Sequence, residues 1–536
     1  MPAGARTYRL TEALIEPKVL PPPPTRHALL AFLIALAAIL HIGTVGWSDI
    51  QNGAPGFYSS AAREILRTDN WTVSAPPLSY WLSAVACKFI GFTAAAVRMP
   101  VAVAMVASVA LTFLIGERLG GYWRGFIAGL IHLCSLGTFI WARMVTPEPL
   151  FAAFLGATVY CVICGYQRQQ KRRFWFAGVW CCAGLACLTR GIVGLFLPVA
   201  IFLLFAIFFR EARLRFRHLF YWPNLLLFLA LVIPPYAWLG FHAFLPFDGG
   251  RNFDEGVPLL RFLVAHFLWW FPAAILVLPG VCFGWRKVFR PHEFEFADAL
   301  PLCWMAVGFL PLLFFRQRQH FDSLNMWSAF ALFAAAAWER TPSRLRFAGL
   351  VLVALAGAVV VGAAAFATAA LPPLPPSRLG VRLVLLLAGL SLVFFVAIAG
   401  HYSWRNRETL AITVLMLGMV PIGLGIVEGL GRFGPYLSLA DAARFLEADL
   451  GEDGEVLFEG SAFRGSSLGF YLDRPPSFVA PEDADATIAR LSVAHPVYLI
   501  VARERVPYWQ ERLTEHFHIF HQETTCGAYV ILNNQP

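Results

Sequence analysis

The chain has 536 residues, of which 58% are hydrophobic and 14% are charged, and its mean hydropathy is +0.63. Soluble globular proteins carry about 25% charged residues, so this composition excludes a soluble domain and predicts an α-helical polytopic membrane protein. The formal net charge of +9 does not indicate nucleic-acid binding, because the Lys and Arg residues lie between apolar runs, where they orient helices in a membrane.

The ten cysteines predict neither a disulfide framework nor a zinc site, because they are scattered through apolar stretches without paired loop spacings. His132 and His266, inside predicted spans, are interpreted as packed side chains, since neither has a second ligand at helical spacing. The pattern therefore indicates no metal ligands, and the use of a divalent metal as a cofactor stays open.

Apolar runs long enough to cross a bilayer follow one another along the chain. A membrane-spanning helix needs about 20 apolar residues, and we expect thirteen of them after a basic tail over residues 1–27. The runs lie at residues 28–47, 96–116, 124–142, 148–166, 174–188, 191–209, 219–243, 258–283, 298–315, 320–338, 345–370, 380–402 and 408–430. A shorter run at 77–92 leaves its placement in the membrane open.

The basic residues predict the orientation of these spans. With the tail in the cytoplasm, the cytoplasmic segments hold about 22 Lys and Arg residues and the outer loops about 12, the asymmetry that the positive-inside rule requires. An odd number of spans then places the C-terminal segment outside. We therefore expect a multi-pass protein of the inner (plasma) membrane with a cytoplasmic N-terminus.

Two segments are too polar to lie in the membrane. The first outer loop, residues 48–95, contains GFYSSAAREILR, whose apolar residues recur at helical spacing and predict an amphipathic interfacial helix. Residues 431–536 contain the β-rich runs EVLFE, PVYLIVA and AYVILNN, separated by helical patterns. The chain is thus divided into the cytoplasmic tail 1–27, a transmembrane domain over 28–430 and a small extracytoplasmic α/β domain over 431–536.

Ionisable side chains at the outer ends of the predicted spans are candidate site residues, because charges in a membrane are costly and need partners. In MVTPEPLF, Glu148 lies in the first turn of a helix, where it either belongs to a site or, with Thr146, simply caps the positive helix end. Arg190 interrupts two apolar runs on the outer side. Its guanidinium fits a phosphate, to which it can donate two parallel hydrogen bonds, and equally fits a snorkelling anchor.

A dense cationic turn is predicted between the ninth and tenth spans. The segment FFRQRQHFDSLN places Arg316, Arg318 and His320 in a short outer loop, with Asp322 and Asn325 just inside the next helix. Positive charge on this side of the membrane runs against the orientation rule. The turn therefore favours a phosphate site, with interface anchoring as the alternative.

Five motifs, taken in order, resemble a known family. They are AREIL in a long first outer loop, WTVSAPPLSYWL, ARMVTPEPLFAAFL, LACLTRGIVGLFLP and FFRQRQHFDSLNMWSAFALF. Their order is similar to that in the aminoarabinose transferase and protein O-mannosyltransferase superfamily, the membrane GT-C glycosyltransferases, over most of the chain. The extracytoplasmic α/β tail is similar to that of the aminoarabinose branch. The resemblance implies inverting transfer of a sugar from a polyprenyl-phosphate donor to a lipid, glycan or protein acceptor on the outer face of the inner membrane.

The resemblance also assigns individual residues. The family's Asp after Thr-Pro is Glu148 here, its Lys after Leu-Thr is kept in charge as Arg190, and the Tyr of its amphipathic helix is Tyr58. The family's Asp-Glu pair, four residues before that Tyr, supplies the general base for the acceptor. Ala54 and Pro55 replace it in this chain.

A second departure concerns the family's Glu-Lys before Pro-Pro-Leu, whose Lys meets the donor phosphate and which is replaced here by Ser74 and Ala75. A neutral side chain cannot supply the roughly 10²- to 10⁴-fold that a general base contributes. Asp49, nine residues before Tyr58, is the only acidic residue nearby and otherwise reads as a solvated turn residue. We hypothesise that Asp49 is the base and that Arg190 and the cationic turn stabilise the leaving phosphate.

Two other function classes remain. The missing Asp-Glu pair favours a catalytically silent family member that binds a polyprenyl lipid or a partner protein, whereas the retained cations and Glu148 favour an enzyme. A secondary transporter would have interrupted helices in paired halves with polar groups near the midplane. The polar groups of this chain gather at one face, which makes transport the weakest of the three.

Overall fold

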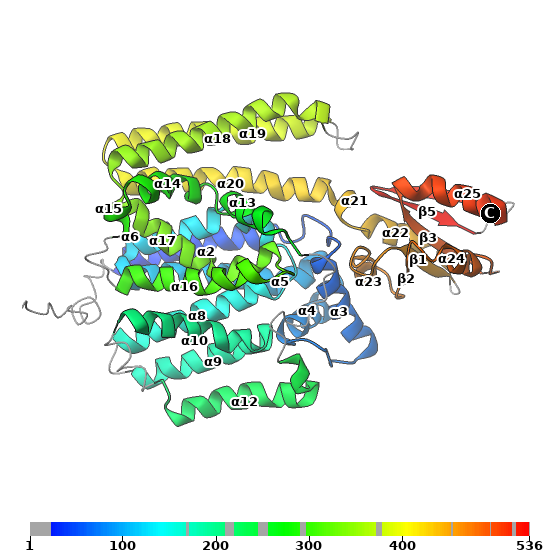
Figure 1. Ribbon diagram of the computed structural model, residues 1–536, viewed down its shortest axis with the longest axis horizontal. Coiled ribbons are helices and arrows are strands. Elements are labelled where there is room, and N and C mark those ends of the chain that lie inside the picture. The colour runs from blue at the N-terminus through cyan, green and yellow to red at the C-terminus, as the bar shows by residue number, and fades with distance from the viewer. Residues whose placement is uncertain are drawn as a thin grey trace, which may run out of the picture.

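The structure is a computed structural model that describes residues 23–167, 171–209, 219–244, 256–289, 296–370, 378–451, 454–493, 495–516 and 521–534. A bundle of roughly parallel and antiparallel helices carries a small sheet with flanking helices at one end (Figure 1). Most of the predicted tail 1–27, several predicted cytoplasmic basic residues and the link 371–377 lie outside the described residues.

Each of the thirteen predicted apolar runs falls on a helix or on a consecutive helix pair. The bundle helices are α2 (Pro23–His41), α5 (Ala94–Gly120), α6 (Tyr122–Cys134), α7 (Leu136–Trp141), α8 (Glu148–Gln167), α9 (Arg172–Arg190), α10 (Val193–Phe208), α12 (Trp222–Leu239), α13 (Leu259–Trp269), α14 (Ala273–Phe283), α15 (Trp285–Phe289), α16 (Phe296–Phe314), α17 (Trp327–Arg340), α18 (Ser343–Ala370), α19 (Arg378–Trp404) and α20 (Glu408–Arg432).

Seven helices of the described residues are long and apolar enough to cross a membrane alone: α5, α8, α12, α16, α18, α19 and α20. The pair α13 and α14 would form an eighth span, bent by 104°. The bend falls at Pro272, which has no N–H to continue the helical hydrogen bonds. The polytopic helical fold is confirmed at this level, while the number of thirteen spans stays a prediction.

Two predicted spans are less regular than their apolar pattern. The run 124–142 is broken at Ser135, whose extended backbone separates α6 from α7. The run 320–338 begins with a 3₁₀ segment, η2 (His320–Met326), before α17. There the Asp322 carboxylate accepts the Gln319 N–H at 2.8 Å and the Asn325 amide donates to the Asp322 carbonyl at 2.7 Å. Such side-chain bonds to the backbone compete with regular α-helix.

The first outer loop forms two helices at the end of the bundle that faces the sheet (Figure 1). They are α3 (Ala54–Thr68), with one apolar face buried, and the short apolar α4 (Leu78–Ile90). Gly56 of α3 lies so close to the C-terminal segment that an added Cβ would be 2.4 Å from the Ser466 Oγ. The loop and the C-terminal segment are therefore packed backbone against backbone.

The C-terminal segment folds as one five-stranded sheet with helices against it. The strand order is β2-β1-β3-β5-β4, with β1 parallel to β2 and β3, and β5 antiparallel to β3 and β4. The predicted runs EVLFE, PVYLIVA and AYVILNN form β1, β3 and β5. The elements are α21 (Gly434–Leu437), α22 (Ala440–Asp449), β1 (Glu455–Glu459), α23 (Leu468–Tyr471), β2 (Ser477–Val479), α24 (Ala484–Leu491), β3 (Val497–Ala502), η3 (Arg503–Arg505), α25 (Val506–His516), β4 (His521–Cys526) and β5 (Tyr529–Asn533).

Candidate functional site

A hollow of about 760 Å³, its open mouth included, lies between α8, α9, α10, α16 and η2. Charged and amide side chains line one part of it, and aromatic and aliphatic side chains line the rest. The lining residues are Glu148, Phe151, Arg190, Val193, Phe196, Leu197, Gly308, Pro311, Leu312, Phe315, Gln317, Asp322 and Asn325. The hollow thus combines fixed charge with a continuous apolar wall.

A buried charge cluster stands at the polar part of this hollow. The Arg190 Nη1 donates to the Glu148 Oε1 at 2.8 Å, and its Nη2 lies 3.8 Å from the Asp322 Oδ1. The side chains of Arg190, Glu148 and Asp322 are only 10%, 1% and 4% exposed. The Arg190 Nε is buried without a hydrogen-bond partner among the described residues. The cation is therefore fixed in place and retains donor capacity.

The backbone around Arg190 explains its position. Arg190 is the last residue of α9, and Gly191 ends the helix with φ 60° and ψ −140°, a conformation that favours glycine. A Cβ on Gly191 would stand 2.5 Å from the Phe244 carbonyl oxygen, and the Ile192 N–H donates to that same oxygen at 2.9 Å. The chain thus turns sharply, and the guanidinium is left at the helix end beside α8.

Glu148 is more than a capping residue in this structure. Among the described residues, the Thr146 hydroxyl has no hydrogen-bond partner, so the structure does not favour the alternative in which Thr146 caps this helix. The Glu148 carboxylate pairs instead with Arg190, 42 residues away in sequence. Glu148 and Arg190, which the sequence indicated as separate candidates, thus form one ion pair.

The cationic turn is only partly joined to the hollow. Arg318 is buried and donates to the carbonyls of Leu312, Leu313 and Val257 at 2.7, 3.1 and 3.1 Å. It therefore satisfies the carbonyls at the C-terminal end of α16, the arrangement expected of a helix cap. Arg316 is exposed and has no ion-pair partner among the described residues. Neither guanidinium lines the hollow, whereas Gln317 between them does.

His320 and Tyr58 occupy aromatic surroundings. The His320 ring is half-buried, with its centroid 5.7 Å from that of Trp269 and 6.2 Å from that of Trp141. Tyr58 is 4% exposed on α3, and its ring centroid lies 5.2 Å from that of Tyr80 on α4. In these positions, His320 belongs to the wall behind the turn and Tyr58 joins the two helices of the first outer loop.

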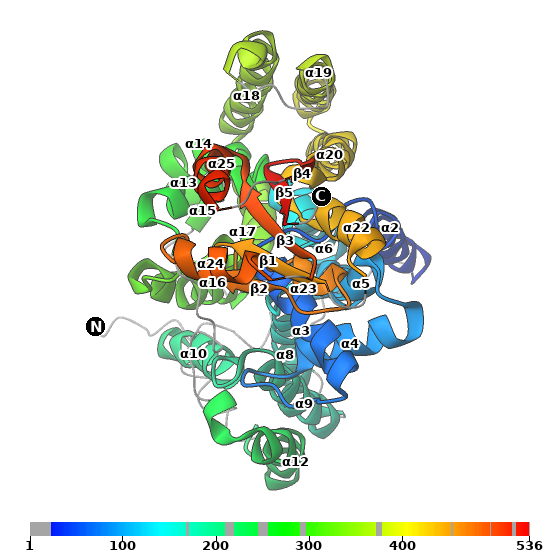
Figure 2. The ribbon, with the colours of Figure 1, turned by 90° about the vertical axis from the view of Figure 1, so that its right-hand side faces the viewer.

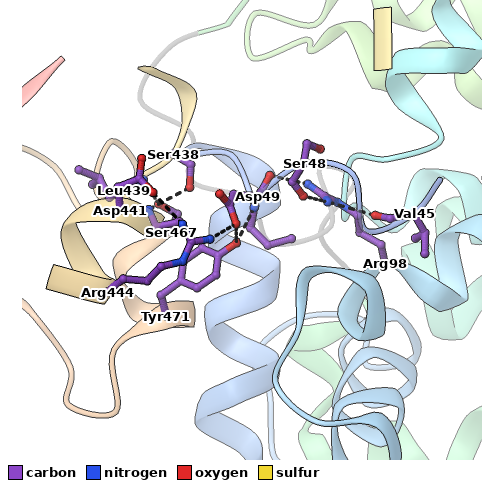
Figure 3. A network of polar contacts seen from close by, with 12 residues as sticks. Val45, Ser48, Asp49, Arg98, Ser438, Leu439, Asp441, Arg444, Ser467 and Tyr471 are labelled. Atoms are coloured by element: carbon purple, nitrogen blue, oxygen red, sulfur yellow. Dashed lines mark hydrogen bonds and ion pairs between the residues drawn. The ribbon is translucent and has the colours of Figure 1, made fainter. Parts of the chain in front are cut away.

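Asp49 lies against the C-terminal segment (Figure 3). Its Oδ1 accepts a hydrogen bond from the Arg444 Nη2 at 2.6 Å and another from the Tyr471 hydroxyl at 3.2 Å. That hydroxyl in turn accepts the Ile50 N–H at 2.8 Å. Burial raises the pKa of the Tyr471 phenol above its usual value, so it stays a neutral donor. Asp49 is not among the residues that line the hollow around Arg190.

A fully buried arginine holds the loop that carries Asp49 (Figure 3). Arg98 of α5 is 0% exposed, and its guanidinium donates to the carbonyls of Ser48, Asp49 and Arg143, the last two at 2.7 and 2.8 Å. It also donates to the Gln51 Oε1 at 3.2 Å. A buried cation that finds only backbone and amide acceptors replaces its lost hydration with oriented dipoles. Arg98 thus binds the backbone of this loop from the side of α5, and Arg444 binds the Asp49 carboxylate from the side of the C-terminal segment.

Sequence reasoning did not single out Arg98, Arg143, Arg444 or Tyr471. Arg98 and Arg143 had a usable signal, since each is an arginine at the edge of an apolar run on the predicted outer side. Arg444 and Tyr471 had none, because their role depends on which loop the C-terminal segment meets. Among the described residues, no group of three or more His, Cys, Asp or Glu side chains could hold a metal ion.

Comparison with known proteins gives the fold a family context. Residues 74–238 match the family model described as dolichyl-phosphate-mannose-protein mannosyltransferase. An uncharacterised protein of Aquifex aeolicus is 25% identical over 210 residues, 37% of this chain and 42% of that protein. An undecaprenyl phosphate-α-4-amino-4-deoxy-L-arabinose arabinosyl transferase of Sodalis glossinidius is 27% identical over 287 residues, 48% of this chain and 49% of that protein. The chain thus spans about half the length of these curated relatives.

Solved structures extend the likeness to nearly the whole chain. The crystal structure of ArnT from Cupriavidus metallidurans in the apo state has a TM-score of 0.77 at 17% identity and covers 95% of this chain and 98% of that one. The chain therefore has the fold of this ArnT. The oligosaccharyltransferase AglB of Archaeoglobus fulgidus is more distant, with a TM-score of 0.53 at 12% identity over 90% of this chain and 70% of that one. The resemblance noted from the five sequence motifs is thereby confirmed.

Proposed function

We propose that the chain is a membrane glycosyltransferase that moves a sugar from a polyprenyl-phosphate donor to a lipid, glycan or protein acceptor, with inversion, on the outer face of the inner membrane. The observation that carries the proposal is the buried Arg190 guanidinium in a hollow with an apolar wall. A polyprenyl phosphate presents the same two features, an anion and a hydrocarbon tail. The printed names of the matched proteins support this donor class: ArnT was crystallised bound to undecaprenyl phosphate, and AglB is in complex with a dolichol-phosphate.

The chemistry gives Arg190 a defined task. When the sugar leaves the carrier, the bond between its anomeric carbon and a phosphate oxygen breaks, and negative charge grows on that oxygen. A guanidinium already held in position stabilises this charge without reorganising at the moment of reaction. Glu148 and Asp322 hold that guanidinium from two sides, at 2.8 and 3.8 Å. They act as positioning residues.

The acceptor also needs a base, and Asp49 remains the proposed one. In the structure its carboxylate is held by Arg444 and Tyr471. Both lie in the C-terminal segment and bond to the Oδ1, so an acceptor that uses this oxygen competes with the Arg444 guanidinium, whose side chain is 56% exposed. On this proposal the C-terminal segment controls access to the base.

A second candidate is a catalytically silent member that binds a polyprenyl lipid. Two observations favour it: Ala54 and Pro55 stand where the family has its carboxylates, and Asp49 is engaged in an ion pair. Both candidates require the phosphate site, and only the enzyme requires Asp49. The two are therefore separable by experiment.

The phosphate site is tested by measuring how undecaprenyl phosphate and undecaprenol, which lacks the phosphate, bind to the purified full-length chain in detergent. We expect the phosphate form to bind more tightly, and Arg190→Ala to remove that preference because the fixed cation is lost. Arg286→Ala, an exposed arginine of α15 that lines neither this hollow nor its surroundings, is the matched control and should bind as the unchanged chain does. Equal binding of the two lipids by the unchanged chain would refute the site.

Transfer itself is tested in membrane vesicles supplied with a polyprenyl-phosphate sugar pool, following release of the free carrier phosphate. If the chain is an enzyme, Asp49→Asn abolishes release while binding of undecaprenyl phosphate stays unchanged. Unaltered release by Asp49→Asn would remove Asp49 from the mechanism. Binding of the carrier without any release by the unchanged chain would select the silent member.

A further inference from the structure

A second large hollow lies far from the charge cluster, between α18 and α19. Figures 1 and 2 show these two helices side by side at the edge of the bundle, with α14 and α20 beneath them. The hollow measures about 1580 Å³ with its open mouth included. It lies where α18 begins and α19 ends, which is the end of the bundle opposite the C-terminal sheet.

Glycine contacts explain why the two helices leave this space. A Cβ on Gly389 would stand 2.9 Å from the Gly357 carbonyl oxygen, so the two backbones touch at this crossing. Beyond it, toward the mouth, a Cβ on Gly400 would meet no atom within 4 Å. The helices are therefore in backbone contact at one level and separated by open space about three turns further along α19.

The walls of the hollow are apolar and its mouth is cationic. Phe347, Leu350 and Val396 line the deeper part, and Arg344 and His401 line the mouth. The lining residues of α18 run from Arg344 to Ala354, ten residues further along the helix, which corresponds to about 15 Å. That depth is about half of the roughly 30 Å hydrocarbon core of a bilayer. The hollow therefore matches the part of a lipid that lies within one leaflet.

Among the described residues, no acidic side chain forms an ion pair with the arginine at the mouth. Arg346, two residues beyond Arg344, is paired with Glu408 of α20 at 3.0 Å. The Arg344 guanidinium itself has no ion-pair partner among the described residues, and Arg405 lies in the adjoining turn. The exposed Trp404 ring also lines the mouth, and tryptophan favours the headgroup level of a membrane. The mouth thus offers an arginine without an ion-pair partner among the described residues, at the end of an apolar wall where a lipid phosphate would lie.

We propose that this hollow is a binding site for an anionic glycerophospholipid, with its phosphate on Arg344 and His401 and one acyl chain against Phe347, Leu350 and Val396. Charge complementarity selects the headgroup, and the depth of the apolar wall selects a lipid of a single leaflet. The site is separate from the hollow at Arg190, and the proposal does not depend on the glycosyltransferase function.

The experiment is native mass spectrometry of the full-length chain in mild detergent, offered an equimolar mixture of phosphatidylglycerol and phosphatidylethanolamine. We expect the unchanged chain to retain one phosphatidylglycerol in preference. Each cation near a membrane surface contributes about fivefold in affinity for an anionic lipid. The variant Arg344→Ala with His401→Ala should therefore lower retention at least about fivefold, whereas Arg286→Ala, an exposed arginine at the same end, should leave it unchanged.

A steric variant tests the hollow without changing charge. Gly400→Leu fills the open space and should lower phosphatidylglycerol retention, while Gly362→Leu, whose Cβ also meets no atom within 4 Å but which does not line the hollow, should not. Equal retention of the two phospholipids by the unchanged chain would overturn the proposal. So would retention that survives both the charge and the Gly400 variants, or a preference for undecaprenyl phosphate over phosphatidylglycerol that these variants abolish.

Discussion

Replacing Arg190 by Met separates the structural role of the buried ion pair from its proposed binding role. The change removes the ion pair with Glu148 at 2.8 Å and the contact with Asp322 at 3.8 Å. At an effective dielectric constant of about 20, the lost attractions are about 6 and about 4 kcal/mol. Desolvation of the three charges offsets part of this, so the net cost of removing the buried cation is about 3–5 kcal/mol. We expect a lower thermal midpoint, by on the order of 5 °C.

The double variant Arg190→Met with Glu148→Gln removes the nearer uncompensated carboxylate as well as the cation. Replacing both members of a buried pair is often close to neutral, so more than half of the lost midpoint should return. Undecaprenyl phosphate binding should not return, because no cation remains in the hollow. The measurements are thermal unfolding followed by tryptophan fluorescence in detergent and binding of the lipid at 25 °C. Wild-type binding by the double variant would refute the proposed role of Arg190.

Three further variants test the framework around the site. Arg98→Met should destabilise the chain by about 3 kcal/mol or more, because several buried carbonyls lose their hydrogen-bond donor. Amide hydrogen exchange should then rise over residues 45–51. Unchanged exchange there would contradict the proposal that Arg98 holds this loop. Gly191→Ala should lower the free energy of unfolding by about 1–3 kcal/mol, since the positive φ and the nearby Phe244 carbonyl disfavour a Cβ. It should also weaken binding of undecaprenyl phosphate. Gly362→Ala is the control and should change neither quantity. Arg444→Ala should change the free energy of unfolding by less than about 1 kcal/mol. It should also speed acceptor-dependent release of carrier phosphate, whereas Asp49→Asn should abolish that release. Slower release by Arg444→Ala would refute the proposed role of Arg444 in controlling access to Asp49.

Asp49 illustrates how a residue can be noticed in a sequence while its surroundings are missed. The chain order places it nine residues before Tyr58, and this spacing is compatible with a carboxylate directed at an acceptor. Its partners come from α22 and α23, 395 and 422 residues later in the chain. No local pattern predicts that Arg444 and Tyr471 meet this loop, because the meeting depends on how the C-terminal segment packs against α3.

The sequence by itself determined the class of fold, the positions of the apolar helices and the strands of the C-terminal sheet. These follow from local composition and periodicity, since an apolar run must satisfy its backbone hydrogen bonds within one helix when it lies in lipid. It also indicated Glu148 and Arg190 as residues of interest, because charges at span ends are costly.

Only the tertiary structure decided which of these charges act together. It paired Glu148 with Arg190 and placed Asp322 beside them, and it turned Arg318 back toward the C-terminal end of α16. Each outcome depends on the packing of helices distant in sequence and on turns such as the one at Gly191. A buried charge takes whichever partner the fold brings within a few ångströms, and that distance is a property of the packed bundle rather than of any segment.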